Sequence, residues 1–125
     1  MTSLTPAQLG ALGEQLAVDH LRGLGLQLLA RNWRCPHGEL DLIAADPATG
    51  TLVFVEVKTR TTDAFGGPAQ AVTPQKVRRL RRLAGLWLAA QRAGPRNRWS
   101  AIRIDVIGVR IAAGPPDISH LQGVG

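Results

Sequence analysis

Cysteine is almost absent from this sequence, and aromatic residues are scarce. The chain of 125 residues has one cysteine, two phenylalanines, three tryptophans and no tyrosine. A single cysteine, Cys35, cannot form an internal disulfide, which excludes the disulfide-stapled class of small secreted domains. His37 lies near it, but no second Cys/His pair completes a structural zinc site. Because 45% of the residues are hydrophobic, we expect one aliphatic core in a single domain over residues 1–125.

The sequence also lacks a long apolar run. Glu14 and Asp19 interrupt the leucines near the start, and no window approaches the ~18 apolar residues that a membrane span needs. No basic segment precedes an uninterrupted apolar stretch, as it would in a signal peptide. We therefore expect a cytoplasmic protein with no membrane partner.

Lysine is scarce as well, since only Lys58 and Lys76 occur among the 15 basic residues. The ammonium group is a compact charge whose pKa burial can shift, unlike the guanidinium group of arginine, so both lysines are candidates for a specific role. The net charge of +6 and the pI of about 11.3 favour a polyanionic partner, nucleic acid before an anionic membrane surface. Simple solubility is the alternative explanation.

Hydrophobic periodicity predicts the element order α-β-β-β-α-β. The first helix opens at Thr5-Pro6 and ends near Gly23 and Gly25. Its predicted apolar stripe consists of Leu9, Leu12, Leu16, Ala17, Leu21 and Leu24. Strands are predicted at 26–34, 38–46, 51–60 and 101–111, with a loop at 61–72, a break at Gly94-Pro95 and, within the tail 114–125, a short edge strand at 118–121.

The second helix, which opens at Thr73-Pro74, is strongly two-sided. Its predicted inward face consists of Val77, Leu80, Leu83, Ala84, Trp87 and Leu88, and its outward face of Arg78, Arg79, Arg81 and Arg82. Strand 51–60 is apolar on both faces apart from its end, so it is predicted to be central and covered by helices. Three meandering strands followed by a helical crossover predict an α/β fold with a mixed central sheet flanked by helices.

Four charged residues stand in the otherwise apolar second and third strands. If the turn Asp46–Thr51 closes a hairpin, Asp41 lies opposite Glu56, and Glu39 lies opposite Lys58, all on one face. Two carboxylates roughly 4.5–5.5 Å apart repel each other unless a cation or a proton lies between them, and Mg²⁺ prefers such ligands. The ammonium of Lys58 could orient or deprotonate a water for phosphodiester hydrolysis. The alternative is a structural ion pair between Glu39 and Lys58 beside a partly wet edge.

The motifs Gly38-Glu39-Leu40-Asp41-Leu42-Ile43 and Val53-Phe54-Val55-Glu56-Val57-Lys58-Thr59-Arg60 resemble the YraN-like family of small bacterial proteins. That family resembles the PD-(D/E)XK nucleases and the archaeal Holliday-junction resolvases, which implies a restriction-endonuclease-like core. The resemblance implies that Asp41 and Glu56 bind a divalent metal, that Glu14 completes the metal site and that Lys58 assists the attacking water. Leu40 departs from the namesake pattern, which has proline there.

Other charged residues are assigned to outer parts of the site. Lys76, Arg60 and the row Arg78, Arg79, Arg81 and Arg82 are candidates for contact with a nucleic-acid backbone, although solvated helix faces have the same pattern. Glu39 and Asp105 are candidates to support the metal ligands, and Asp105 could instead pair with an arginine. The three histidines show no spacing typical of metal ligation.

The resulting hypothesis is a Mg²⁺- or Mn²⁺-dependent endonuclease acting on DNA rather than RNA, on branched or damaged forms, as a monomer or a homodimer. Two alternatives remain open at this point. One is a catalytically inactive nucleic-acid-binding module with a nuclease fold, and the other is a protein-interaction subunit with a basic helix.

Overall fold

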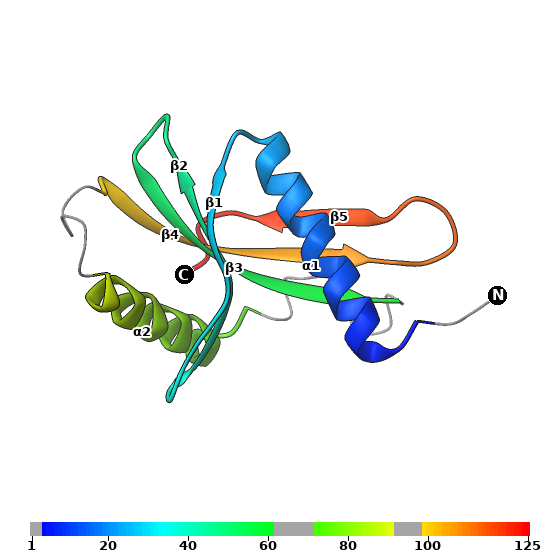
Figure 1. The fold of residues 1–125 in the computed structure, drawn as a ribbon, viewed down its shortest axis with the longest axis horizontal. Coiled ribbons are helices and arrows are strands. Elements are labelled where there is room, and N and C mark those ends of the chain that lie inside the picture. The colour runs from blue at the N-terminus through cyan, green and yellow to red at the C-terminus, as the bar shows by residue number, and fades with distance from the viewer. Residues whose placement is uncertain (1–3, 62–71, 92–98) are drawn as a thin grey trace.

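A computed structural model describes residues 4–61, 72–91 and 99–125 of the chain (Figure 1). The elements are α1 (Pro6–Gly23), β1 (Gln27–Cys35), β2 (Gly38–Asp46), β3 (Thr51–Arg60), α2 (Pro74–Ala90), β4 (Ala101–Arg110) and β5 (Asp117–Leu121). The predicted order α-β-β-β-α-β is confirmed, with β5 as the added edge strand. The predicted loop lies mostly outside the described residues, and the predicted break at Gly94-Pro95 lies wholly outside them.

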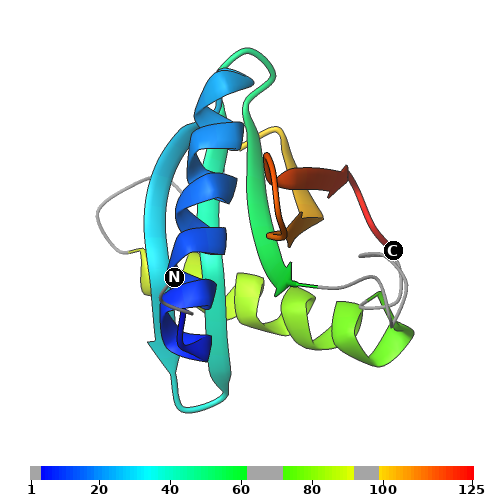
Figure 2. The same ribbon diagram turned by 90° about the vertical axis from the view of Figure 1, so that its right-hand side faces the viewer.

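The five strands form one mixed sheet in the order β1-β2-β3-β4-β5. The β3–β4 pair is parallel, and the other three pairs are antiparallel. Helices α1 and α2 cover opposite faces, as the two views in Figures 1 and 2 show. Each face has its own core cluster, one packed around Ala17, Val18 and Leu21 of α1 and the other around Leu80, Leu83 and Trp87 of α2. Strand β3 is central, as its two apolar faces predicted.

Both helices begin at the caps that the sequence predicts. The hydroxyl of Thr5 accepts from the N–H of Gln8 in a capping box, and that of Thr73 accepts from the N–H of Lys76. The inward face of α2 is confirmed, since Val77, Leu80, Leu83, Ala84 and Trp87 are buried. Leu88, the last residue of the predicted face, is half-buried against the same cluster. Neither of the described helices is long and apolar enough to cross a bilayer.

The inward face of α1 differs from the predicted stripe. Leu12 and Leu24 are exposed, whereas Gly13 and Val18 are buried beside Ala17 and Leu21. Gly13 explains the rotation of the face, because a Cβ atom added there would lie 1.9 Å from Oγ1 of Thr59 on β3. The helix therefore approaches the sheet through a glycine, a contact that a hydrophobicity pattern does not register.

Substitution of Gly13 by alanine should destabilise the protein. The added Cβ would also lie 2.8 Å from Cβ of Thr59, so the helix or the strand must move, at a cost of about 1–3 kcal/mol. Gly10→Ala is the matched control, because nothing lies within 4 Å of its added Cβ. It should raise the free energy of unfolding by about 0.5–1 kcal/mol, since alanine favours the helix. Urea unfolding of both variants would measure the difference, and equal effects would contradict the close approach.

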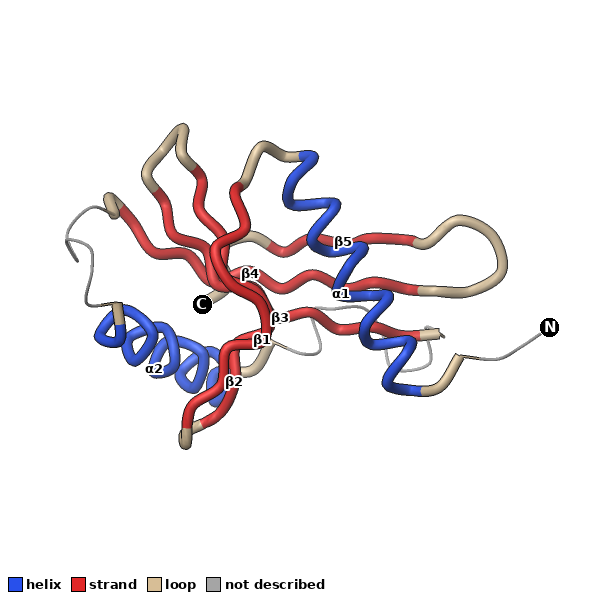
Figure 3. The backbone as a smooth tube through the Cα atoms, viewed as in Figure 1, coloured by secondary structure: helices blue, strands red, loops and turns tan. Residues whose placement is uncertain are grey.

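The β2–β3 hairpin has the predicted register but a shorter ladder. Pairing runs from Asp46↔Thr51 to Leu42↔Val55 and ends there among the described residues of the two strands. Beyond this point β2 turns away with β1, while β3 continues beside β4 (Figure 3). The two strands therefore open at the position where the sequence placed its candidate site.

Candidate functional site

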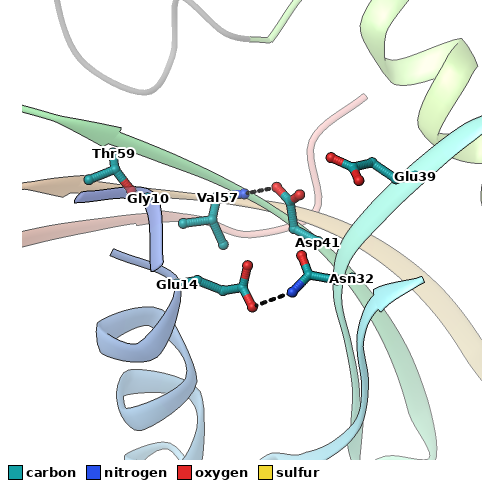
Figure 4. Close-up of a pocket in the computed structure, with 7 residues that line it drawn as sticks. All are labelled: Gly10, Glu14, Asn32, Glu39, Asp41, Val57 and Thr59. Atoms are coloured by element: carbon teal, nitrogen blue, oxygen red, sulfur yellow. Dashed lines mark hydrogen bonds between the residues drawn. The ribbon is translucent and has the colours of Figure 1, made fainter. Parts of the chain in front are cut away.

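Asp41 lies at the point where β2 and β3 separate. Its Oδ2 accepts a hydrogen bond of 2.9 Å from the backbone N–H of Val57, so the carboxylate replaces the ladder at this level. Asp41 lines a pocket of about 300 Å³ between α1 and the sheet (Figure 4), which has room for several water molecules. The other residues that line the pocket are Gly10, Glu14, Asn32, Glu39, Val57 and Thr59.

The alternation of side chains breaks in β1 and β2 beside this pocket. Leu40 and Ile43 both pack against the α2-side cluster although they are three residues apart, and so do their partners Trp33 and Ala30 on β1. A regular strand would place such residues on opposite faces. Asn32, between them, has φ 51°, and it is the one non-glycine residue with positive φ among those described. This local turn of the backbone lies at the level where the alternation breaks, and Asn32 and Asp41 both line the pocket on the α1 side.

The prediction that all four charged residues share one face is therefore wrong. Glu39 and Asp41 line the pocket on the α1 side with Val57, whereas Glu56 contacts α2 through an ion pair of 3.0 Å between its Oε1 and Nζ of Lys76. Nζ of Lys58 lies 4.0 Å from the same oxygen. The predicted alternative pairing of Glu39 with Lys58 is replaced by an exposed ion pair between Glu39 and Arg34 at 3.1 Å.

Glu14 reaches the pocket from α1, as the resemblance implied. Its Oε1 accepts from Nδ2 of Asn32 at 2.9 Å and from Nε of Arg31 at 3.2 Å. The side chain of Glu14 is only 15% exposed, so these two donors offset much of its desolvation. Figure 4 shows Asn32 between Glu14 and Asp41.

The carboxylates of the pocket act on one another through their charges. Burial, opposed by the hydrogen bond from Val57 and supported by the charges of Glu56, Glu39 and Glu14, raises the pKa of Asp41 from 3.8 to about 6. The surroundings of Asp41 therefore stabilise its ionised form poorly, and a cation bound nearby would stabilise that form.

Asp41→Asn should stabilise the metal-free protein at neutral pH. Asparagine keeps an oxygen for the N–H of Val57 but carries no charge. Because the pKa of Asp41 is raised on folding, its destabilising effect is absent below about pH 4, grows as the pH rises to about 6 and is complete above that. In the presence of a chelator, the variant should exceed the wild type by about 2 kcal/mol at pH 7.5 and match it near pH 4. Urea titrations at both pH values would measure this, and a variant less stable at pH 7.5 would contradict it.

The two lysines of the chain meet at Glu56. Burial, followed by the charge of Lys76 and a hydrogen bond with it, lowers the pKa of Lys58. The carboxylates of Glu56 and Asp41 oppose this shift but do not cancel it. A larger share of Lys58 is thus neutral near pH 7 than for an ordinary lysine, and a neutral amine can accept a proton.

The oxygen donors of the site fit a hard divalent cation in their chemistry. Asp41 lines the pocket, and Glu56, which does not line it, lies close enough for its charge to raise the pKa of Asp41. Glu14 is held toward the same pocket. In the described part of the chain, no three His, Cys, Asp or Glu side chains are grouped as a ready set of metal ligands. Glu56 and Glu14 are instead paired with Lys76 and Arg31.

The outward arginines of α2 lie where the sequence predicted. Arg78, Arg79, Arg81 and Arg82 are all exposed. Two of them have partners, because Arg81 donates to the backbone oxygen of Gly125 at 3.1 Å and Arg82 to Nδ1 of His37 at 3.2 Å. The half-buried Arg60 is the last residue of β3, and its backbone oxygen accepts from Ile111. The basic face exists, and its contact with nucleic acid remains a prediction.

Asp105 belongs to a separate buried network on the sheet. It is 0% exposed, and its two oxygens accept from Nε and Nη2 of Arg103 at 2.9 and 3.0 Å and from the N–H of Gly123 at 3.0 Å. Oδ2 also contacts Nε2 of His120 at 2.7 Å, and Nδ1 of His120 contacts Nε2 of His20 at 3.0 Å. None of these residues lines the pocket of Asp41, so the alternative role, partner of an arginine, is the one that the structure supports.

Sequence reasoning missed several residues of the two clusters. Asn32 carried a usable signal, because asparagine is depleted in strands and enriched at positive φ. No signal in the sequence marked Gly10 or Thr59 as part of the pocket. Nor did any signal indicate the contact between His20 and His120, which joins residues 100 positions apart.

Comparison with known proteins places the chain among close relatives. Residues 13–109 match the model described as "Uncharacterised protein family UPF0102". A "UPF0102 protein" of Mycolicibacterium smegmatis is 67% identical over 126 residues, which cover 100% of this chain and 98% of that protein. A second, from Mycobacterium ulcerans, is 68% identical over 126 residues and 100% of both chains. A third, from Mycobacterium avium, is 66% identical over 125 residues, covering 99% of this chain and 94% of that one. The names of these relatives state a family and no activity.

Proposed function

We propose that this chain, which belongs to the uncharacterised protein family UPF0102, is a Mg²⁺- or Mn²⁺-dependent endonuclease that hydrolyses phosphodiester bonds in DNA, in particular branched or damaged DNA. One observation carries the proposal. The half-buried carboxylate of Asp41, with a pKa raised to about 6, lies at the opening between β2 and β3, from which Glu56 and Lys58 also extend. We place the protein in the cytoplasm, as a monomer or a homodimer.

Different residues of the site have different roles in the proposed hydrolysis. Asp41 and Glu56, with Glu14 in support, would hold the divalent cation. Bound there, the cation would neutralise negative charge that builds on the phosphate oxygens. Lys58 takes a proton from the attacking water, for which its lowered pKa suits it. The water oxygen forms the new bond to phosphorus, the bond from phosphorus to the leaving oxygen breaks, and that oxygen takes up a proton from solvent.

The basic face of α2 supplies a means of holding the substrate. Arg78 and Arg79 are exposed on the helix that also carries Lys76, and Lys76 is in contact with Glu56. A DNA backbone that lies along this face would therefore come close to the carboxylates. Arginine contacts of this kind make binding strongly salt-dependent.

A cleavage assay tests the proposal. The full chain would be incubated at moderate salt with single-stranded, duplex, flap and four-way-junction DNA, with Mg²⁺, with Mn²⁺ and with a chelator. We expect cutting that requires the metal and differs between the substrates. Absence of cutting on every substrate, at protein concentrations where DNA is fully bound, would overturn the endonuclease.

The ion pair between Lys76 and Glu56 favours a second candidate, a DNA-binding module without catalysis. An ammonium at 3.0 Å from the carboxylate already supplies the positive charge that a metal would bring. This candidate predicts salt-sensitive DNA binding that a chelator leaves unchanged. A protein with neither DNA binding nor metal dependence would instead match the interaction subunit that the sequence left open.

A further inference from the structure

Asn32 is the one described non-glycine residue that lines the pocket with its backbone in the left-handed region. Its φ of 51° is unfavourable for residues other than glycine, although asparagine tolerates it better than most. Strained backbone persists where the surrounding structure holds it, and it is concentrated at functional sites. The turn at Asn32 also breaks the alternation of β1, so that Arg31 and Asn32 both reach Glu14 on α1.

The amide of Asn32 has a defined orientation. Nδ2 donates to Oε1 of Glu14 at 2.9 Å, and this bond fixes Oδ1 at the other end of the amide. In Figure 4 that oxygen is turned toward the Asp41 side chain, across the pocket. One side chain therefore lies between two carboxylates that both line the pocket.

A regular strand would not bring this amide into the pocket. The register places Asn32 between the pairs Arg31↔Leu42 and Trp33↔Leu40, and thus opposite Asp41. With ordinary alternation, Asn32 would lie on the α2 side together with Ala30, which precedes it by two residues. The left-handed turn avoids that placement, and the close approach of α1 brings Glu14 within reach.

We propose that Asn32 is a positioning residue, which holds the Glu14 carboxylate beside Asp41 for cation binding. This inference deepens the proposed function and rests on it. Without the amide, Arg31 would be the one donor left to Glu14 among the described residues, and its side chain is 39% exposed and also binds Gln15. The carboxylate would then turn with Arg31 toward solvent, and the pocket would lose one of its oxygen donors.

The test combines two substitutions in a cycle. Mn²⁺ binding would be measured by electron paramagnetic resonance for the wild type, Asn32→Gly, Glu14→Gln and the double variant, and DNA cleavage would be measured alongside. Glycine adopts positive φ freely, so Asn32→Gly keeps the backbone and removes only the amide. Unfolding in urea checks that the fold is retained. Gln27→Ala is the control on the same strand, because Gln27 is exposed, pairs with Ala45 at the other end of the strand and does not line the pocket.

We expect Asn32→Gly to weaken Mn²⁺ binding about tenfold, as loss of a residue that orients a metal ligand does. The double variant should bind as weakly as Glu14→Gln alone, since Asn32 acts through Glu14, and Gln27→Ala should bind like the wild type. An Asn32→Gly variant that matches an active wild type, or losses that simply add in the double variant, would overturn the positioning role and leave the endonuclease standing. A wild type that neither binds Mn²⁺ nor cuts DNA would overturn both.

Discussion

Lys58→Ala should lose DNA cleavage by roughly 10³-fold while it keeps its fold and its DNA binding. Nζ of Lys58 lies 4.0 Å from Oε1 of Glu56. Because the pKa of Lys58 is lowered, its neutral amine can accept a proton from water in the proposed reaction. The side chain is 38% exposed, so its truncation removes little packing. Single-turnover cleavage of the preferred substrate at saturating protein would measure the loss separately from binding.

Two further variants make the result specific. Lys58→Arg keeps a positive charge but cannot release its proton near neutral pH, so it should be nearly as inactive as Lys58→Ala if proton transfer is the role of this residue. Arg22→Ala removes an exposed cation from the last turn of α1 and should cut like the wild type. Full activity in Lys58→Ala would remove the proposed mechanism, and full activity in Lys58→Arg alone would reduce the role of Lys58 to its charge.

Asp105→Ala should lower the free energy of unfolding by about 3 kcal/mol, the largest effect on stability that we expect from a single polar substitution. Asp105 is 0% exposed, and its removal leaves the guanidinium of Arg103, the ring of His120 and the N–H of Gly123 without their acceptor. The side chain of Arg103 is 26% exposed, so breaking this pair leaves a largely desolvated charge without its partner. Urea unfolding at pH 7 would measure the loss.

Asp117→Ala is the matched control for this result. Asp117 also pairs with an arginine, Arg110 on β4, but its side chain is 62% exposed. Exposed pairs of this kind contribute about 0–1 kcal/mol, so the variant should unfold almost like the wild type. Equal losses in the two variants would show that the buried network has no special part in stability.

The strands and helices could be predicted from the sequence because a local pattern of apolar and turn residues marks each of them. The bounds of β2 and β3 agree with the predicted 38–46 and 51–60, since turn residues delimit two apolar runs. The amphipathic pattern of α2 predicted its buried face, because the arginines and the apolar residues separate cleanly at helical spacing. The family was recognisable from the motifs around Asp41 and Glu56, and the match over residues 13–109 confirms it.

The arrangement of the site did not follow from the sequence. The register predicted where Asp41 lies along β2, but one left-handed residue, Asn32, and the early end of the ladder at Leu42↔Val55 decided which side it faces. Alternation assumes a regular strand, and a single turn of the backbone reverses every side chain beyond it.

The sequence by itself determined the elements of this protein, their order, the mixed sheet and the identity of the charged residues in its apolar strands. Only the tertiary structure decided which charges meet. Lys76 contacts Glu56 because α2 packs against the face of the sheet that carries Glu56. Glu14 contacts Asn32 because Gly13 lets α1 approach the sheet. Asp105 contacts His120 because β5 pairs with β4. Periodicity records how each residue relates to its near neighbours along the chain, whereas these contacts depend on the packing of elements that are distant in sequence.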